Sequence, residues 1–265
     1  MELQDFPLPP HETLPTMYDL PSELPGEPGL PDEFHRLQAD LLSQTCRPAN
    51  WPLDQVFTAC DLNLYYDPHH PRWYKRPDWF VTLGVSRAAR QEILRWSYVI
   101  WQEGRSPSIV MELLSPGTEA EDLGQTLREI NQPPTKWEVY EQFLRIPYYV
   151  VYDRYHNQLR VFRLEGFRYR ELELPQPRHW LEDMGLGLGL WQGRFQGTEG
   201  LWLRWYDQDN HWLPTDAEQT EQERQRAEQE HQRAEQEHQR AEQERQRAER
   251  LAEQLRQLGG DPDRL

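Results

Sequence analysis

The last fifth of the chain most restricts what the remainder can fold into, because it carries almost no apolar side chains. From Asp216 onward a seven-residue unit related to RAEQEHQ recurs, and its alanines keep a strict spacing: Ala227, Ala234, Ala241 and Ala248. Alanine, glutamate, glutamine and arginine all favour helix, so the repeat predicts one long charged helix over residues 215–260. Such a helix has no core of its own, so the folded domain must come from the roughly 200 residues before it.

The surface of this predicted helix leaves two interpretations open. A coiled coil needs apolar residues at two core positions of each seven-residue repeat. If the alanines hold one of these positions, the other is held by basic residues up to Leu251, which makes a poor seam: Arg224, His231, His238 and Arg245. One interpretation is a solvated helix stabilised by its own Glu/Arg pairs. The other is weak or pH-sensitive self-association, which would make the protein a homodimer. The two histidines are interpreted as members of the repeat and not as metal ligands.

The opposite end of the chain predicts an extended arm. Residues 1–30 are acidic and rich in proline, which excludes regular helix and central strand. They show no secretion signal, and no apolar run in the chain approaches the ~18 residues of a membrane span. The only two cysteines, Cys46 and Cys60, lack metal-ligand spacing and are expected to be reduced thiols. These features favour a cytoplasmic protein with no membrane partner.

The charge balance limits the partners of the chain. Its net charge is −16, and residues 1–215 carry 20 Lys and Arg against 31 Asp and Glu. Proteins that coat nucleic acid need a basic footprint, which neither part of this chain has. Tight non-specific DNA binding is therefore disfavoured, whereas a transient encounter through a local basic cleft is compatible with the sequence.

Residues 31–214 predict one α/β domain built around a mixed sheet. Apolar spacing predicts helices over 32–46, 119–130 and 136–146. Apolar and β-branched runs predict strands over 55–67, 77–85, 97–104, 108–115, 147–155, 158–166 and 167–174. The glycine-rich segment 185–193 predicts an edge strand or a turn, because it lacks the context of a phosphate-binding loop.

The predicted strand 108–115 contains an anomaly, a carboxylate in a run that should be buried. Glu112 stands between Met111 and Leu113, and an unpaired ionised carboxylate there would cost several kcal/mol or more. A salt-bridge partner, protonation or a metal ion could satisfy it. A metal requires a second carboxylate on a neighbouring strand, and Asp78, at the entrance to the strand 77–85, is the candidate. We expect 79–85 and 97–104 to form a hairpin that returns the chain so that 108–115 lies beside it.

Lysine is scarce, which draws attention to its two positions. Of 29 basic residues only Lys75 and Lys136 are lysines; one precedes Asp78 and the other opens the helix after the Glu112 strand. Two carboxylates with a lysine suit metal-assisted phosphodiester hydrolysis. The carboxylates would hold Mg²⁺, and the ammonium would orient a water molecule or stabilise developing negative charge.

Three motifs together carry a resemblance to a known family. The runs 77-PDWFVTLGV-85, 108-SIVMELLSP-116 and 136-KWEVYEQFLRIPYYVVYD-153 resemble the Uma-two family of putative restriction endonucleases, within the PD-(D/E)XK superfamily. The resemblance spans about residues 30–175. It implies a mixed sheet flanked by helices, a hydrolase acting on phosphodiester bonds, and Asp78 and Glu112 as metal ligands with the backbone carbonyl near Leu113 as a third.

The sequence departs from the plain superfamily motif at one position. The residue two after Glu112 should be lysine, but it is Leu114. The resemblance implies that Lys136 supplies the ammonium from the following helix. Glu33, on the first predicted helix, is a further candidate for reaching the site.

Two functions follow as hypotheses. The first is a Mg²⁺-dependent DNA endonuclease that uses Asp78, Glu112 and Lys136. The alternative is a catalytically inactive nuclease-like module whose C-terminal helix mediates dimerisation or binds a partner.

Overall fold

The structure is a computed structural model that describes residues 32–115, 117–126, 128 and 132–257. It divides into two compact units, Met1–Leu213 and Pro214–Leu265, which are described separately. The arm expected over residues 1–30 lies outside the described residues. Among the described helices, none combines the length and hydrophobicity that crossing a bilayer requires.

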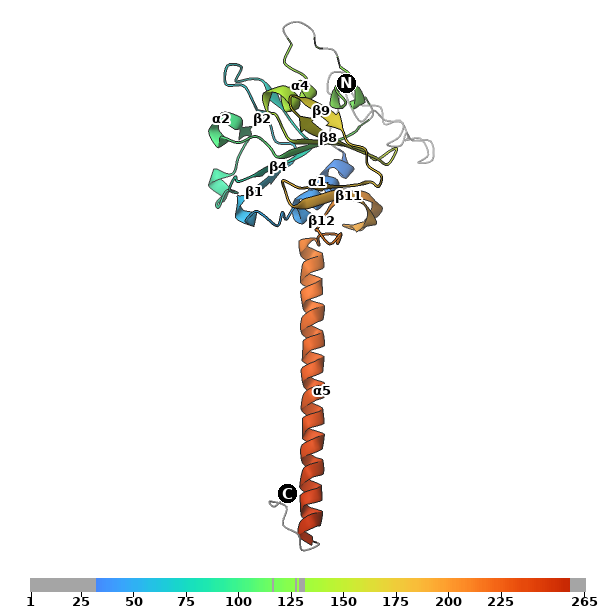
Figure 1. Cartoon of the computed structure of the whole chain (residues 1–265). Helices are drawn as coiled ribbons and strands as arrows, with labels where there is room; N and C mark the ends of the chain where they lie inside the picture. The colour runs from blue at the N-terminus through green and yellow to red at the C-terminus, as the bar shows by residue number, and fades with distance from the viewer. Residues whose placement is uncertain (1–31, 116, 127, 129–131, 258–265) are drawn as a thin grey trace, which may run out of the picture. The chain divides into compact units, whose positions relative to one another are not determined.

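The first unit is built on a six-stranded mixed sheet, which confirms the α/β class (Figure 1). Its strand order is β1-β4-β6-β7-β8-β9. Only β6 and β7 are parallel neighbours, and the other pairs are antiparallel. The strands are β1 (Val56–Ala59), β4 (Trp79–Leu83), β6 (Ile109–Leu113), β7 (Tyr148–Asp153), β8 (Gln158–Glu165) and β9 (Arg168–Glu171).

The β4–β6 pairing brings the two predicted metal-ligand positions together. Trp79 pairs with Met111 and Phe80 with Val110, so the same antiparallel register carried one step further sets Asp78 opposite Glu112. Every residue of β4 and β6 is buried, which is why both strands read as continuous apolar runs. Side chains alternate between the faces of a strand, so Glu112 shares its face with Val110.

The path between β4 and β6 differs from the hairpin expected from the sequence. Residues 97–104 form a two-residue strand β5 (Tyr98–Val99) followed by one helical turn, α2 (Ile100–Glu103). Gly104 ends this turn at a φ of 71°, with its N–H bonded to the carbonyl of Ile100. The prediction of a hairpin with 79–85 is wrong, because β5 belongs to a separate small sheet of order β3-β2-β5, with β2 (Leu64–Tyr65) and β3 (Tyr74–Lys75).

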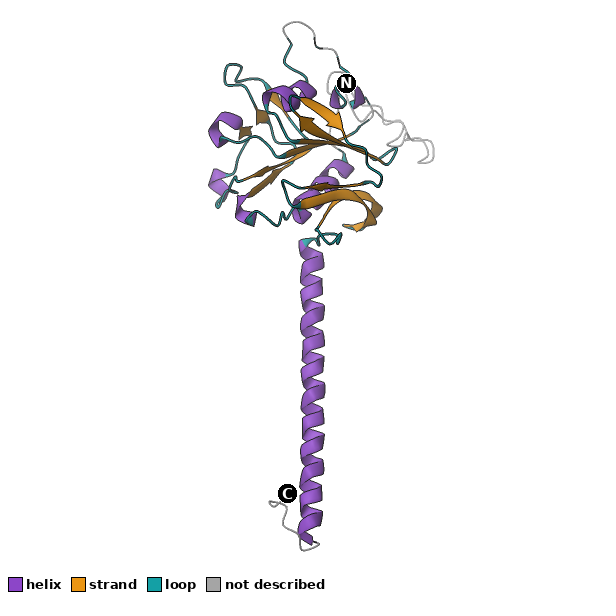
Figure 2. Cartoon of the chain, in the orientation of Figure 1, coloured by secondary structure: helices purple, strands orange, loops and turns teal. Residues whose placement is uncertain are grey.

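Helices cover the two faces of the main sheet (Figure 2). Helix α1 (Glu33–Thr45) is capped by Asp32, whose side chain accepts from the N–H of His35, and it buries Leu41 and Leu42. Leu42 shares a cluster with Trp79 and Met111, which places α1 on one face. On the other face lie α3 (Glu119–Asp122), α4 (Lys136–Glu138) and the π-helical turn η4 (Val139–Phe143). The buried cluster on this face of the sheet includes Tyr140, Phe80 and Val110.

The glycine-rich segment forms a central strand, which corrects the expectation of an edge strand or turn. A three-stranded sheet has the order β10-β11-β12, with β10 (Arg178–Leu181), β11 (Leu186–Phe195) and β12 (Thr198–Tyr206). A Cβ at Gly187 would overlap the ring of Tyr206, and one at Gly193 would overlap the ring of Trp191. Aromatic packing against the strand therefore requires the glycines.

The second unit contains the predicted long helix, α5 (Asp216–Gln257), which spans 42 residues. Thr215 and Glu218 cap it reciprocally, each accepting from the backbone N–H of the other. Ion pairs one turn apart, such as Arg224 with Glu221 and Arg245 with Glu242, lie along its surface. Each such pair contributes about 0.2–0.5 kcal/mol, which fits a helix with so few apolar residues.

Candidate functional site

Glu112 is fully buried at the centre of the site, and both of its carboxylate oxygens have donors. The Lys136 ammonium lies 3.1 Å from Oε2, and the Tyr140 hydroxyl donates to Oε1 at 2.9 Å. The backbone N–H of Asp78 also approaches Oε2, at 3.4 Å. The anomaly of a carboxylate inside a buried strand is therefore resolved by partners from α4, η4 and the residue that precedes β4.

Asp78 joins β4 to β6 through its side chain. Its Oδ2 accepts from the N–H of Leu113 at 2.6 Å, and the side chain keeps 17% of its surface exposed. This bond continues the β4–β6 ladder one residue beyond the strand. It holds the Asp78 carboxylate beside Glu112 and open to solvent on one side.

Lys136 enters from the first position of α4. Thr135 caps this helix through a reciprocal pair with Glu138, which fixes where the lysine side chain begins. The ammonium lies 2.9 Å from Oδ1 of Asp122 in addition to its contact with Glu112. The three sequence-predicted groups, Asp78, Glu112 and Lys136, are thus brought together, with the lysine arriving from the helix.

Three further residues of the site were not identified from the sequence. Asp122, on α3, gave no signal because it stands in an acidic stretch that is typical of a solvated helix. Tyr140 lies within the helix predicted over 136–146 and gave no signal of its own, but its hydroxyl donates to Oε1 of Glu112. His35, on α1, donates from Nε2 to the carbonyl of Leu113 at 3.0 Å and lies 3.9 Å from Oδ2 of Asp78.

His35, and not Glu33, is the α1 residue that reaches the site. Glu33 is exposed, whereas His35 is buried, and its Nδ1 lies 2.8 Å from Oδ1 of Asp32. Burial lowers the pKa of His35, but the hydrogen bond that its protonated ring donates to Asp32 and the charge of Asp78 outweigh burial and leave the pKa raised. The helix cap and the candidate metal-ligand carbonyl are therefore tied through one imidazole ring.

The electrostatics of the site are dominated by an excess of carboxylates. Burial raises the pKa of Glu112 well above its ordinary value; Lys136 opposes this rise, and Asp78 and Asp122 add to it. Burial likewise raises the pKa of Asp78. The pKa of Lys136 is raised because the neighbouring carboxylates outweigh its own burial. Three carboxylates around one ammonium favour an additional cation.

The donor atoms present fit a hard divalent cation. They comprise the carboxylates of Asp78 and Glu112 and the carbonyl of Leu113, and oxygen ligands of this kind suit Mg²⁺. His35, which is not itself one of these ligands, donates a hydrogen bond to the Leu113 carbonyl. Hydrogen bonds of this kind commonly orient the ligands of a metal.

A polar cavity of about 220 Å³ opens onto Asp78 and Lys136. Its lining is Asp61, Tyr74, Lys75, Arg76, Asp78, Gly117, Thr118, Glu121 and Lys136. Three of these residues are basic and three are acidic, so the lining is balanced in charge, whereas the chain as a whole is strongly negative. Lys75, the other lysine of the chain, is in this lining, with its ammonium 4.0 Å from Glu121.

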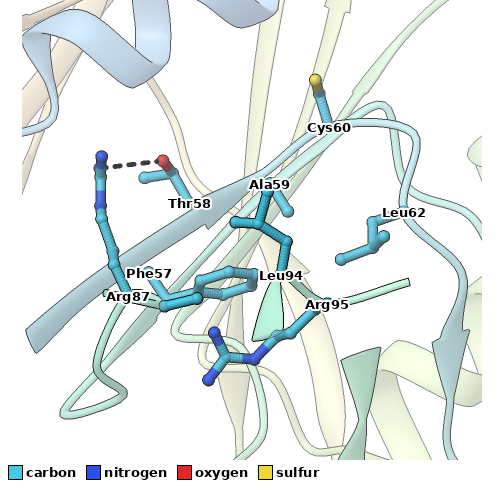
Figure 3. A pocket seen from close by; sticks show the side chains of 9 residues that line it. Phe57, Thr58, Ala59, Cys60, Leu62, Arg87, Leu94 and Arg95 are labelled. Atoms are coloured by element: carbon cyan, nitrogen blue, oxygen red, sulfur yellow. Dashed lines mark hydrogen bonds between the residues drawn. The ribbon is translucent and has the colours of Figure 1, made fainter. Parts of the chain in front are cut away.

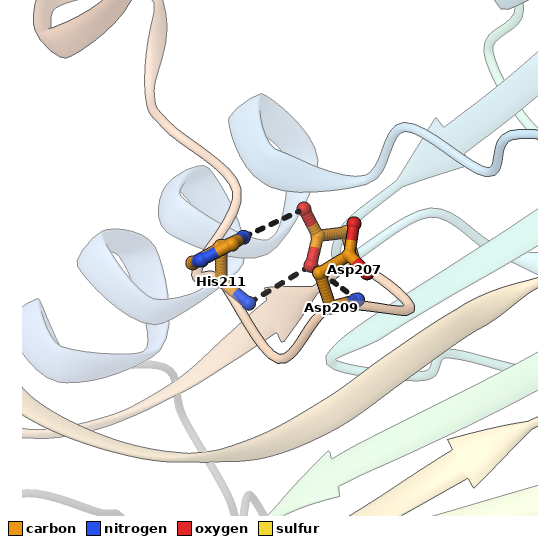
Figure 4. A group of neighbouring side chains, drawn as sticks. All are labelled: Asp207, Asp209 and His211. Carbon is orange, nitrogen blue, oxygen red and sulfur yellow. Dashed lines mark hydrogen bonds and ion pairs between the residues drawn. The ribbon is translucent and has the colours of Figure 1, made fainter.

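A second group of potential metal ligands lies in the turn after β12 (Figure 4). Asp207, Asp209 and His211 place one ligand atom each within 4.8 Å of one another. One oxygen of Asp207 already accepts from the N–H groups of Asp209 and His211, at 2.9 and 2.8 Å. These bonds account for the turn, and none of the sequence-predicted site residues belongs to it.

A larger cavity, of about 330 Å³, lies beside β1 (Figure 3). Its lining includes Phe57, Leu62 and Leu94, and at one edge of it Arg87 donates to the hydroxyl of Thr58 at 3.2 Å. No carboxylate contributes to this lining, so the cavity does not suit a hard divalent cation.

The mixed sheet and the convergence of Asp78, Glu112 and Lys136 define a restriction-endonuclease-like protein. The profile of the Uma2 family, described as "Putative restriction endonuclease", matches residues 12–196, and the chain belongs to this family. A similar solved structure is that of a putative nuclease belonging to DUF820 from Anabaena variabilis ATCC 29413. It is 16% identical, covers 57% of this chain and 73% of that chain, and has a TM-score of 0.36. Among curated proteins, no sequence matches this chain.

Proposed function

We propose that this protein is a Mg²⁺-dependent DNA endonuclease. Asp78, Glu112 and the carbonyl of Leu113 hold the metal, and Lys136 acts on the scissile phosphate. The observation that carries the proposal is the 3.1 Å contact between the Lys136 ammonium and Glu112. Leu114 occupies the position where the superfamily motif has its lysine, so the ammonium must come from another element, and α4 supplies it.

Each residue of the site has a distinct part in the proposed hydrolysis. A bound Mg²⁺ would polarise the phosphate and lower the pKa of a water molecule. Lys136, whose pKa is raised, stays protonated and serves as a fixed positive charge for the negative charge that develops on the phosphate. Tyr140 holds Glu112 in place through its hydroxyl, and His35 orients the Leu113 carbonyl.

The charge distribution supports a substrate that is bound briefly. The cavity presents Lys75, Arg76 and Lys136 on a chain of net charge −16. These side chains can contact few phosphates, and the negative charge on the rest of the surface repels DNA. We therefore expect DNA binding to be weak and sensitive to salt. We expect the protein to act on DNA in the cytoplasm.

The proposal is tested directly by the metal dependence of DNA nicking and by substitution of Asp78. Supercoiled plasmid should be nicked in Mg²⁺, EDTA should stop the reaction, and added Mg²⁺ should restore it. Asp78→Asn should slow nicking by about 10²-fold or more, because one charged group at the reacting centre is lost. The matched control is Asp207→Asn in the turn after β12, which should nick at the wild-type rate. Normal nicking by Asp78→Asn, or loss of nicking by Asp207→Asn, would refute the assignment.

We further propose that α5 joins two copies of the chain into a homodimer. Its alanines are exposed and keep the seven-residue spacing of a coiled-coil seam. The basic residues of the other core position are flanked by glutamates, such as Glu230 and Glu237, so a second helix would bring opposite charges together. The same helix would serve the alternative function, an inactive nuclease-like module, if no nicking is found.

Substitutions on α5 test the dimer. The double variant Ala234→Glu/Ala241→Glu should be monomeric in sedimentation equilibrium, because it places carboxylates in the seam. Gln232→Glu/Gln239→Glu adds the same charge on the outer face of the helix and should stay dimeric. A wild type that is monomeric at every concentration would exclude this role for α5.

A further inference from the structure

An exposed aromatic ring stands at the wall of the catalytic cavity. Tyr74 lies on β3, pairs with Tyr65 of β2, and lines the same cavity as Asp78 and Lys136. Its side chain keeps 47% of its surface exposed, and its ring packs against Tyr65 at a centroid distance of 5.5 Å. The proposed hydrolysis gives this ring no task.

The residues that follow Tyr74 are cationic and line the same cavity. Lys75 and Arg76 come directly after it, and Asp78 lies two positions further on. An aromatic ring beside positive charges is the combination with which proteins bind unpaired nucleic acid: bases stack on the ring while cations contact the backbone. In duplex DNA the faces of the bases are covered by their neighbours, so an aromatic wall can be used only by an unstacked base.

The size and charge of the surroundings disfavour a duplex. The cavity of about 220 Å³ is lined by the acidic groups Asp61 and Glu121 in addition to its cations. A duplex would lay two phosphate strands against this surface, and it would meet few cations to offset the repulsion. A single strand needs one line of phosphate contacts and gains from stacking.

We propose that the substrate of this site is DNA with unpaired nucleotides, such as a single strand or a flap. Tyr74 stacks on a base next to the scissile phosphate, and Lys75 and Arg76 contact the backbone. The inference rests on the proposed endonuclease function and specifies its substrate class.

Binding and cleavage of matched oligonucleotides test this inference on the full-length protein. Fluorescence anisotropy with the inactive Glu112→Gln protein should show tighter binding of a labelled single strand than of the duplex of the same sequence. Adding Tyr74→Ala should raise the Kd for the single strand by about 10-fold or more, the effect of losing one stacked base. Tyr74→Phe should keep the affinity. In the active protein, Tyr74→Ala should raise KM for the single strand and change kcat little.

The controls separate this inference from the proposed function. Phe167→Ala removes an aromatic side chain that is 73% exposed and lies outside the cavity lining, and it should leave single-strand binding unchanged. A duplex bound and cut as well as the single strand, or no effect of Tyr74→Ala, would overturn the inference. Tyr74-dependent binding without cleavage in Mg²⁺ would overturn the hydrolysis and leave the single-strand site standing.

Discussion

Glu112→Gln is expected to reduce Mg²⁺-dependent nicking of plasmid DNA by about 10²- to 10³-fold, the usual cost of removing one charged group from a catalytic centre. The amide keeps the size of the side chain, and its oxygen can still accept from the Tyr140 hydroxyl. It removes the negative charge that would hold a cation beside Asp78. The loss should therefore appear in the rate of nicking, measured by the conversion of supercoiled to open circular plasmid over time.

The same substitution should lower the free energy of unfolding only modestly. The amide has a single acceptor oxygen, so it cannot accept from both Tyr140 and Lys136. The loss is limited because a neutral side chain avoids part of the cost of a buried charge, and Lys136 keeps Asp122 as a partner. A matched control is Glu141→Gln on η4, which changes another buried glutamate. Glu141 accepts from the N–H of Tyr169 at 2.7 Å and pairs with Arg168 at 2.9 Å, and both of these partners belong to β9 and not to the candidate site. This control should nick normally, and equal nicking by both variants would remove Glu112 from the mechanism.

The parts of the fold that follow from local patterns were predicted correctly. The continuous apolar runs around β4 and β6 indicated buried strands, and the strands of the main sheet fall within their predicted ranges. The proximity of Asp78 to Glu112 was also anticipated, because a charge inside a buried run demands a partner, and the approach of Lys136 was implied by the resemblance to the Uma-two family. A charged residue within an apolar run therefore indicates a candidate site even in a single sequence.

The parts that depend on tertiary contacts could not be obtained in this way. Tyr98 and Val99 read as part of a long strand, but the chain leaves the extended form at Ile100 and ends its helical turn at Gly104. The glycines of β11 are explained by rings packed against them, such as Tyr206, which a linear pattern does not reveal. His35 reads as an ordinary residue of the first turn of a helix, and its role depends on a carbonyl 78 residues away in the chain.

Lys136→Met is expected to lower the free energy of unfolding by about 3–5 kcal/mol, because it removes the cation from buried carboxylates. Glu112 and Asp122 are both buried, and each lies within 3.1 Å of the Lys136 ammonium. The measurement is urea unfolding followed by tryptophan fluorescence. Residues 216–265 contain no tryptophan, so the fluorescence reports on the first unit alone.

Two comparisons assign this loss of stability to the site. Lys75→Met changes the only other lysine, whose partner Glu121 is 4.0 Å away and about half exposed, so it should cost less than about 1 kcal/mol. The double variant Glu112→Gln/Lys136→Met should be more stable than Lys136→Met alone, because one of the two unpaired carboxylates is then neutral. If Lys136→Met unfolds at the wild-type urea concentration, the ammonium does not balance the charge of Glu112. A merely additive double variant would show that the two residues act independently, and the site would then lose the coupling on which the proposed role of Lys136 depends.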